Sequence, residues 1–187
     1  CAKTLTPSPL FATGVIGAYS IANFGNENQK EEYLPKIVSG EMTTAFAIDE
    51  SSHHNPADTE MTAEFKKEKV ILNGKKIFVV DGASADLLIV LARTSGNKGE
   101  TSGLTLFFVN SNSSGVEKIK LDMADSRNYA NIVFSDVEIN KEDILGDIET
   151  GGETAENILD IARIALSAEM LGNSEAAFET TLDYLKQ

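Results

Sequence analysis

About eight short runs rich in Val, Ile and Phe, between positions 44 and 139, constrain the fold most strongly. Gly, Asn, Asp and Ser separate them, as is typical of turns. The run 87–92 is continuously apolar, which predicts a strand buried on both faces. This length and spacing predict an antiparallel β-barrel or sandwich. The expected strands are 44–48, 62–67, 70–80, 87–92, 104–109, 116–121, 129–134 and 137–139. Residues 62–67 and 70–72 are expected to form a hairpin with its turn at Glu68-Lys69, and Asn73-Gly74 is the stronger turn signal.

Helical patterns flank these runs. Residues 10–24 and 29–38 predict two helices, the second capped by Asn26 or Asn28. From position 150 a helical period continues to the end of the chain, and Thr150-Gly-Gly-Glu153 has the form of a capping box. About 33 helical residues would span about 50 Å, too long for a small domain's own core, so we expect this helix to join a bundle. The fold class is therefore α+β.

The charge and cysteine content limit the partners and the compartment. With 29 acidic and 16 basic residues, the 187-residue chain has a net charge of −13. Such a surface repels phosphate backbones and anionic lipid, so neither nucleic acid nor membrane is an expected partner. Cys1 is the only cysteine, and a reducing, cytoplasmic setting is expected. No apolar run approaches the ~18 residues of a membrane span. The chain lacks an initial Met and stops within a helical pattern, which predicts a fragment.

Motifs for chemistry are scarce. No metal-ligand spacing, dinucleotide-binding or P-loop motif, or nucleophile elbow is present. Asp49-Glu50 follows a strand, where neighbouring side chains point to opposite faces, which argues against a joint acid–base site. His53-His54 are adjacent, and a solvated loop pair is favoured over metal ligands. The polar loop 49–56 leaves a strand end, where binding groups commonly lie. The residues alone thus predict a helix–barrel–helix protein with a polar loop at a strand end.

Several short motifs follow one another along the chain. They are FGNENQKEEYLP at 24–35 with Ser39-Gly40-Glu41, AFAIDE at 45–50, LNGKKIF at 72–78 with Asp81-Gly82-Ala83, FSDVEI at 134–139 and Leu145-Gly146. In their order and spacing they resemble the motifs of the acyl-CoA dehydrogenase superfamily. The resemblance runs from about Leu10 to the end of the chain. It implies the end of an N-terminal helical domain at 1–41, a middle β-barrel domain at 42–149, and the first helix of a C-terminal four-helix bundle at 150–187.

The resemblance implies a function. Members oxidise an acyl-CoA thioester across its α–β bond with FAD: a carboxylate removes the α-proton and the β-hydride passes to flavin N5. An electron-transfer flavoprotein or similar acceptor, a homo-oligomer (dimer or tetramer), and a mitochondrial matrix location in a eukaryote are further implications. In most relatives the base is a Glu near the C-terminus of the full protein. It would lie beyond Gln187, so no catalytic residue is assigned here.

Five positions match residues that contact the flavin in relatives. Phe46 and Ile48 match positions whose backbone lies along the flavin. Asp49 falls where a hydroxyl residue usually hydrogen-bonds the isoalloxazine ring. Phe78 matches the aromatic beside the ring, although a core strand Phe is an open alternative. Val80 falls where Thr or Ser commonly contacts N5.

Two positions on the final helix match residues that contact acyl-CoA in relatives, namely Asp160 and Arg163. They are also i, i+3 neighbours, and a simple ion pair on the helix surface is the alternative interpretation.

Departures from the family pattern leave a second function open. Residues 51–58 (SSHHNPAD) replace a Pro-x-x-Gly-Ser-Asp loop, and Asp125 stands where Arg is usual. Asp49 and Val80 lack the expected hydroxyl. A carboxylate at Asp49 would place negative charge near a ring that becomes anionic on reduction. The alternatives are a flavin-deficient or inert member acting as a structural or regulatory subunit, and an oxidase or nitroalkane-type relative. The Arg-x-x-Phe-Gly segment expected to bind a partner's FAD would follow Gln187.

Overall fold

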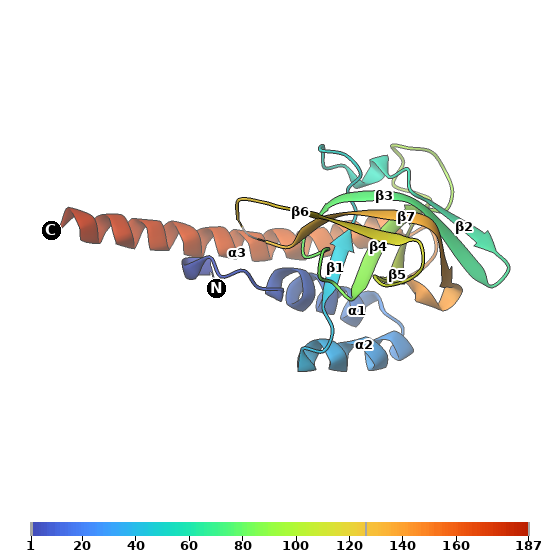
Figure 1. Ribbon diagram of the computed structural model, residues 1–187, viewed down its shortest axis with the longest axis horizontal. Helices are drawn as coiled ribbons and strands as arrows, with labels where there is room; N and C mark the ends of the chain where they lie inside the picture. The colour runs from blue at the N-terminus through green and yellow to red at the C-terminus, as the bar shows by residue number, and fades with distance from the viewer. Residues whose placement is uncertain (1, 126, 187) are drawn as a thin grey trace.

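The structure is a computed structural model that describes residues 2–125 and 127–186, so Cys1 and Gln187 lie outside it. Helices from the two ends of the chain pack against one β-sheet (Figure 1). Helices α1 (Ala18–Phe24) and α2 (Glu27–Ser39) precede the sheet, and α3 (Gly151–Leu185) follows it. The expected α+β class and the helix–sheet–helix order are confirmed.

The sheet has eight strands, in the order β6-β7-β3-β2-β4-β5-β8, with β1 beside β4. It is open, so the expectation of a closed barrel is wrong. Along this path the edge strands β6 and β8 have no pairing with each other. Alternation predicts strands but does not determine how the edges meet, and here β8 is only two residues long. The strands are β1 (Thr44–Ala47), β2 (Thr62–Lys66), β3 (Lys69–Val79), β4 (Leu87–Arg93), β5 (Leu104–Asn110), β6 (Val116–Leu121), β7 (Tyr129–Asn140) and β8 (Ile144–Leu145).

Asn73-Gly74 forms a bulge within β3 rather than the expected turn. Gly74 has a φ of 146°, and the register with β7 shifts between Leu72 and Gly74. A Cβ at Gly74 would lie 2.8 Å from Met61, so the close approach of this residue, just before β2, requires glycine. On the facing strand, Asp136 also has a positive φ, and its N–H donates to the Asn73 side chain at 2.8 Å. The two irregularities therefore lie together, and both strands continue through them.

Strand β4 is buried on both faces, as its continuous apolar sequence predicts. Leu88, Val90 and Ala92 join a core cluster with residues of β3 and β7. Leu87, Ile89 and Leu91 join a second cluster, to which η2, α1 and α3 contribute apolar side chains. The second cluster joins the helices to the sheet and thereby fixes the position of α3 against β4 and β5.

The predicted helix over 10–24 begins as a π-helix, η2 (Leu10–Gly17), and continues as α1. A Cβ at Gly17 would lie 1.9 Å from the Thr44 hydroxyl oxygen, so this turn lies directly against β1. The Thr13 hydroxyl bonds both the N–H of Thr44, at 2.9 Å, and its carbonyl, at 3.3 Å. These contacts hold the side chains of η2 beside the end of β1.

Asn26, one of the two predicted caps, begins α2 with a capping box. Its side-chain oxygen accepts the Gln29 N–H at 2.9 Å, and the Gln29 side-chain oxygen accepts the Asn26 N–H at 3.0 Å. The capping box predicted at Thr150 is wrong. The Thr150 hydroxyl donates instead to the carbonyl of Asp147 at 2.9 Å, so the threonine stabilises the preceding turn.

Replacing Asn26 by alanine should lower the free energy of unfolding by about 1 kcal/mol, the usual cost of losing a helix cap. The loss also frees Gln29, whose amide donates to the carbonyls of Glu142 and Ile144. Urea denaturation followed by circular dichroism measures the change. Asn23→Ala is the matched control, because the Asn23 side chain bonds only the carbonyl of Tyr19 on the surface of α1. Equal effects of the two substitutions would contradict the capping role.

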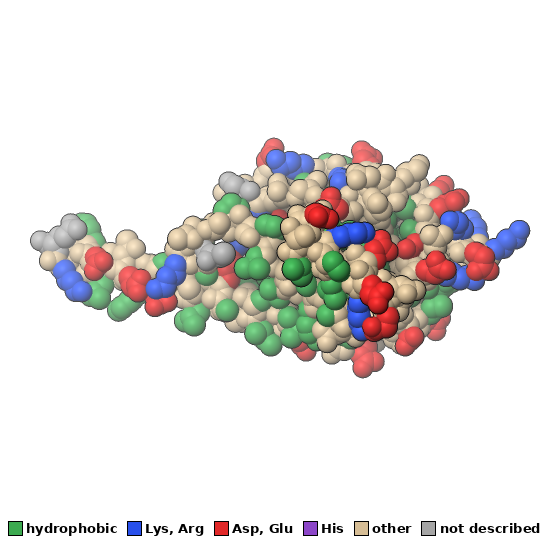
Figure 2. All heavy atoms as spheres, turned by 90° about the horizontal axis from the view of Figure 1, so that it is seen from below, with side chains coloured by type: hydrophobic (Ala, Val, Ile, Leu, Met, Phe, Trp, Pro, Cys, Tyr) green, Lys and Arg blue, Asp and Glu red, His purple; other side chains and the backbone are tan. Residues whose placement is uncertain are grey.

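Helix α3 has 35 residues, and its second half extends past the sheet (Figure 1). Apolar side chains are exposed along this half, as Figure 2 shows from below, among them Met170, Leu171, Phe178 and Leu185. Exposed apolar side chains at helical spacing are typical of a helix that packs against others. Membership of a four-helix bundle stays a prediction, since α3 is the only long helix in the described part of the chain. Among residues 2–125 and 127–186, no helix combines the length and apolar character needed to cross a membrane.

Candidate functional site

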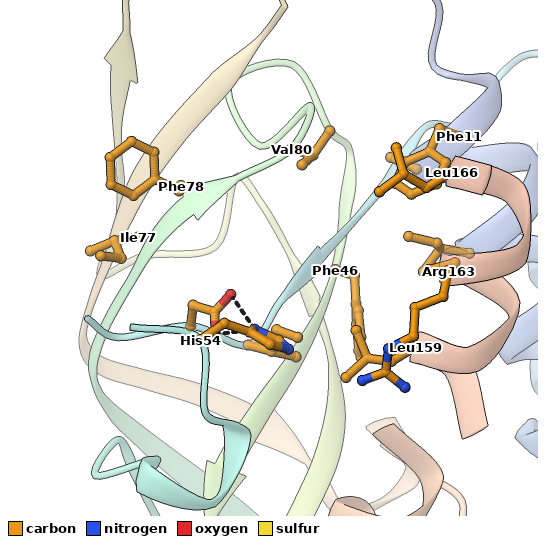
Figure 3. A pocket seen from close by; sticks show the side chains of 14 residues that line it. Phe11, Phe46, His54, Ile77, Phe78, Val80, Leu159, Arg163 and Leu166 are labelled. Atoms are coloured by element: carbon orange, nitrogen blue, oxygen red, sulfur yellow. Dashed lines mark hydrogen bonds and ion pairs between the residues drawn. The ribbon is translucent and has the colours of Figure 1, made fainter. Parts of the chain in front are cut away.

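A cavity of about 330 Å³ lies where η2, the end of β1, the end of β3 and α3 meet (Figure 3). Six of the seven residues singled out from the sequence line it, and only Asp160 does not. Its volume is in the range of small-molecule sites, which are mostly apolar with a few polar groups. The lining residues are Phe11, Ala12, Ile16, Phe46, Ile48, Asp49, His54, Ile77, Phe78, Val80, Leu159, Ala162, Arg163 and Leu166.

The apolar wall of the cavity comes from three separate elements. Phe11 is contributed by η2 and Phe46 by β1. On α3, Leu159, Ala162 and Leu166 recur at spacings of three and four residues, so they share one helix face toward the cavity. Residues more than 100 positions apart in the sequence therefore form one continuous apolar surface.

Phe78 and Val80 lie at the end of β3, where the backbone departs from regular strand geometry. Phe78 has a φ of 49°, which is unusual for a bulky side chain. Its N–H donates to the Asn131 side chain at 3.1 Å, and the residue is 50% exposed. The ring thus lies at the cavity rather than in the core, which was the open alternative for this residue.

Asp49 and Glu50 point to opposite sides of the strand end, as expected. The Asp49 carboxylate lies in the cavity, 2.8 and 3.0 Å from Nδ1 of His54. Its carbonyl accepts the N–H of Ile77 at 2.8 Å, which joins β1 to β3. The sequence analysis missed His54. The side chain of His54 is 49% exposed, which agrees with the expected solvated loop. Its position on the cavity wall was not expected.

Lys76 is the second residue that the sequence analysis missed. Its side chain is completely buried, and Nζ donates to the Glu50 carboxylate at 2.7 Å and to the carbonyl of Ile48 at 2.9 Å. Burial lowers the pKa of Lys76 to about 8, although the adjacent Glu50 carboxylate acts in the opposite direction. The Glu50 carboxylate also accepts the N–H groups of Glu60 and Met61. This ion pair fixes the backbone beneath the cavity. The only signal in the sequence was a lysine within an apolar strand.

Arg163 and Asp160 form an ion pair on the surface of α3, which was the alternative to a contact with acyl-CoA. The Arg163 guanidinium lies 2.7 Å from Asp160 and 3.1 Å from Glu156 on the exposed face of α3. Arg163 also lines the cavity, whereas Asp160 does not. The structure therefore places one of the two at the site and leaves the other on the helix surface.

Asp125, at the position where relatives usually carry Arg, accepts the N–H of Arg127 at 3.2 Å. The Arg127 guanidinium forms an ion pair with Glu169 of α3 and thus joins the β6–β7 connection to that helix. A smaller cavity of about 220 Å³ lies against this pair and shares Phe11 with the larger cavity. No cluster of three His, Cys, Asp or Glu side chains that would suit a metal ion occurs in the described residues.

The site is thus an apolar cavity with a carboxylate–imidazole pair on one side and a guanidinium on α3. Comparisons with known proteins agree with the resemblance seen in the sequence. The sequence model of the acyl-CoA dehydrogenase middle domain matches residues 45–137, and that of the N-terminal domain matches residues 2–41.

Individual proteins match over nearly the whole chain. An acyl-CoA dehydrogenase of Bacillus subtilis (strain 168) is 36% identical over 177 residues, 92% of this chain and 46% of that protein. The butyryl-CoA dehydrogenase structure from Megasphaera elsdenii superimposes with a TM-score of 0.90 at 33% identity, over 96% of this chain and 48% of that one. A structure described as PigA with FAD and proline gives 0.87 at 27% identity, over 94% and 47%. The chain spans about half the length of these relatives. It belongs to the acyl-CoA dehydrogenase superfamily.

Proposed function

We propose that this chain is the central part of an FAD-dependent enzyme that oxidises an acyl-CoA thioester across its α–β bond. The observation that carries the proposal is the convergence of Phe46, Ile48, Asp49, Phe78, Val80 and Arg163 on one cavity. Each of these residues matches a flavin- or substrate-contacting position of the family. The names of the relatives, acyl-CoA and butyryl-CoA dehydrogenase, support the same reaction class.

The cavity fits the ring system of a flavin. Its walls are apolar, with the rings of Phe11, Phe46 and Phe78 around the space in Figure 3. Such walls suit a flat, largely apolar ring that has polar atoms along one edge. The Asp49–His54 pair and Arg163 are the charged or ionisable groups that line this cavity in the described residues. The PigA structure, described as holding FAD, has the same fold over 94% of this chain. When bound, FAD would supply the acceptor for the β-hydride.

The chain's own residues would position the reactants and exclude water. The aromatic and aliphatic walls keep water from the reacting bond, and Arg163 provides a cation for an anionic part of acyl-CoA. The domain limits 1–41, 42–149 and 150–187, a homo-oligomeric assembly and an electron-transfer flavoprotein as acceptor belong to the same proposal. We assign no base for the α-proton within this chain.

The absorbance spectrum of the purified product of the whole reading frame tests this proposal. We expect bound flavin that bleaches when acyl-CoA is added without oxygen. Arg163→Met should weaken acyl-CoA binding about tenfold, the effect of losing roughly one charge-assisted hydrogen bond, without changing flavin content. Lys36→Met, which removes an exposed ion pair of α2, is the control. A protein that stays colourless after FAD is added would refute the proposal and favour the structural-subunit alternative.

A further inference from the structure

Three ionisable side chains line the main cavity in the described residues, namely Asp49, His54 and Arg163. Arg163 is already paired with Asp160 and Glu156 on its own helix. The Asp49 carboxylate, 28% exposed, is therefore the main negative charge beside the apolar walls, and His54 is its partner. Any ligand in the cavity meets these two side chains as one unit.

The backbone at the start of this loop is firmly held. The carbonyl of Asp49 accepts the N–H of Ile77, and the next residue, Glu50, is bonded to Lys76 and to two backbone N–H groups. The position of the Asp49 carboxylate is thus fixed by strand geometry. His54 reaches it from five residues further along, with Nδ1 within 3.0 Å of both carboxylate oxygens. Since Nδ1 bonds Asp49, Nε2 is the nitrogen left for a ligand, and no described residue bonds it.

A lone carboxylate at this position would oppose reduction of any ligand that gains electrons in the cavity. Two like charges close together repel, and the repulsion is stronger at a protein surface than in bulk water because the effective dielectric constant is lower. An imidazole N–H held against the carboxylate offsets this repulsion, and a protonated ring cancels it. The bond between Asp49 and His54 therefore changes the field across the cavity as well as the path of the loop.

We propose that the Asp49–His54 pair forms the polar edge of the flavin site and sets the reduction potential of the flavin. The inference rests on the proposed function, because it requires a flavin in the cavity. Asp49 occupies a position where relatives usually carry a hydroxyl. His54 offsets its charge, so that the pair presents a hydrogen-bonding edge in place of a bare anion. His54 is thus a positioning residue that acts through Asp49.

The midpoint potential of the bound flavin, measured against reference dyes, tests the inference. In His54→Ala the Asp49 charge is no longer offset, so we expect the preference for oxidised over reduced flavin to rise about tenfold. For a two-electron couple this corresponds to a midpoint potential lower by about 30 mV. In the double variant Asp49→Asn/His54→Ala no charge remains, and the midpoint potential should rise again to the wild-type value or above it.

His53→Ala is the matched control, because His53 is the adjacent histidine of the same loop but does not line this cavity. Its potential should equal that of the wild type. Flavin that bleaches with acyl-CoA but has the same potential in His54→Ala would overturn this inference and leave the proposed function intact. A wild-type protein that binds no flavin would overturn both. A decrease that persists in the double variant would assign His54 a role independent of Asp49 and would also overturn the inference.

Discussion

Replacing Lys76 by methionine should lower the free energy of unfolding by about 3 kcal/mol or more at pH 7, because it removes one partner of a buried ion pair. The Lys76 side chain is completely buried, and that of Glu50 is 15% exposed. Methionine fills a similar volume but donates no hydrogen bond. Glu50 would lose its cation, and the carbonyl of Ile48 would lose its donor. Urea denaturation of the wild type and the variant measures the difference.

Two companion variants separate the electrostatic effect from packing. Adding Glu50→Gln to Lys76→Met should recover about 2 kcal/mol, because the unpaired buried charge is removed while the side-chain oxygen still accepts the N–H groups of Glu60 and Met61. Lys75→Met is the control on the same strand, and its exposed side chain should change stability by less than about 0.5 kcal/mol. If Lys76→Met cost no more than Lys75→Met, the ion pair would have no structural role.

The same lysine gives the protein a defined pH dependence. Burial lowers the pKa of Lys76 to about 8 in the folded state, against a usual value of 10.5 when unfolded. Between these values the unfolded chain binds more protons, so the free energy of unfolding should rise with pH. Burial raises the pKa of Tyr33 to about 12, which reverses the trend above about pH 10. From pH 8 to pH 10 the wild type should gain on the order of 2 kcal/mol, and Lys76→Met should not.

Local patterns in the sequence predicted the elements more reliably than the pairings between them. The run 87–92 and the long helical period became β4 and α3, because a continuous apolar run and a 3.6-residue period each depend on neighbouring residues. Closure of the sheet depends instead on how distant edges meet, and no local pattern encodes that. The Asn73-Gly74 pair shows the same limit. Gly74 does have a positive φ, but it lies in a bulge opposite Asp136 rather than in a turn.

The candidate site divides in the same way. Part of its apolar lining could be predicted, because Phe46, Phe78 and Val80 matched family motifs at definite positions. Phe11 and the apolar face of α3 lie outside those motifs and were not predicted. The polar part could not, because the Asp49–His54 bond depends on the path of a loop whose sequence departs from those motifs. The adjacency of His53 and His54 suggested only a possible metal-binding pair, and it gave no information about a partner elsewhere in the loop. The partner of His54 is the carboxylate five residues earlier, Asp49. The sequence related Asp49 to Glu50 and to a flavin-contacting position, but not to a histidine.

The path of that loop depends on Arg93, and Arg93→Met should lower the free energy of unfolding by about 3 kcal/mol, since charge-assisted hydrogen bonds are lost together. The guanidinium, only 9% exposed, donates to five backbone carbonyls within 3.3 Å and to no carboxylate in the described residues. Two of these carbonyls, of Ala57 and Thr59, belong to the segment that follows His54. The other three, of Ser95, Glu100 and Ser102, lie between β4 and β5.

One planar cation thus joins two loops that otherwise share the hydrogen bond from the Gly99 N–H to the Ala57 carbonyl, at 2.9 Å. The loss of this cation should be seen in both loops. Hydrogen exchange in Arg93→Met should become faster over 51–59 and 95–103, while β7 keeps its protection. Arg93→Lys should restore only part of the stability, because an ammonium cannot reach five carbonyls in the geometry of a guanidinium. Arg163→Met, which removes an exposed arginine of α3, should leave exchange in both loops unchanged. Faster exchange in only one loop would show that the other is held by its own contacts, and Arg93 would then not connect the His54 segment to the sheet.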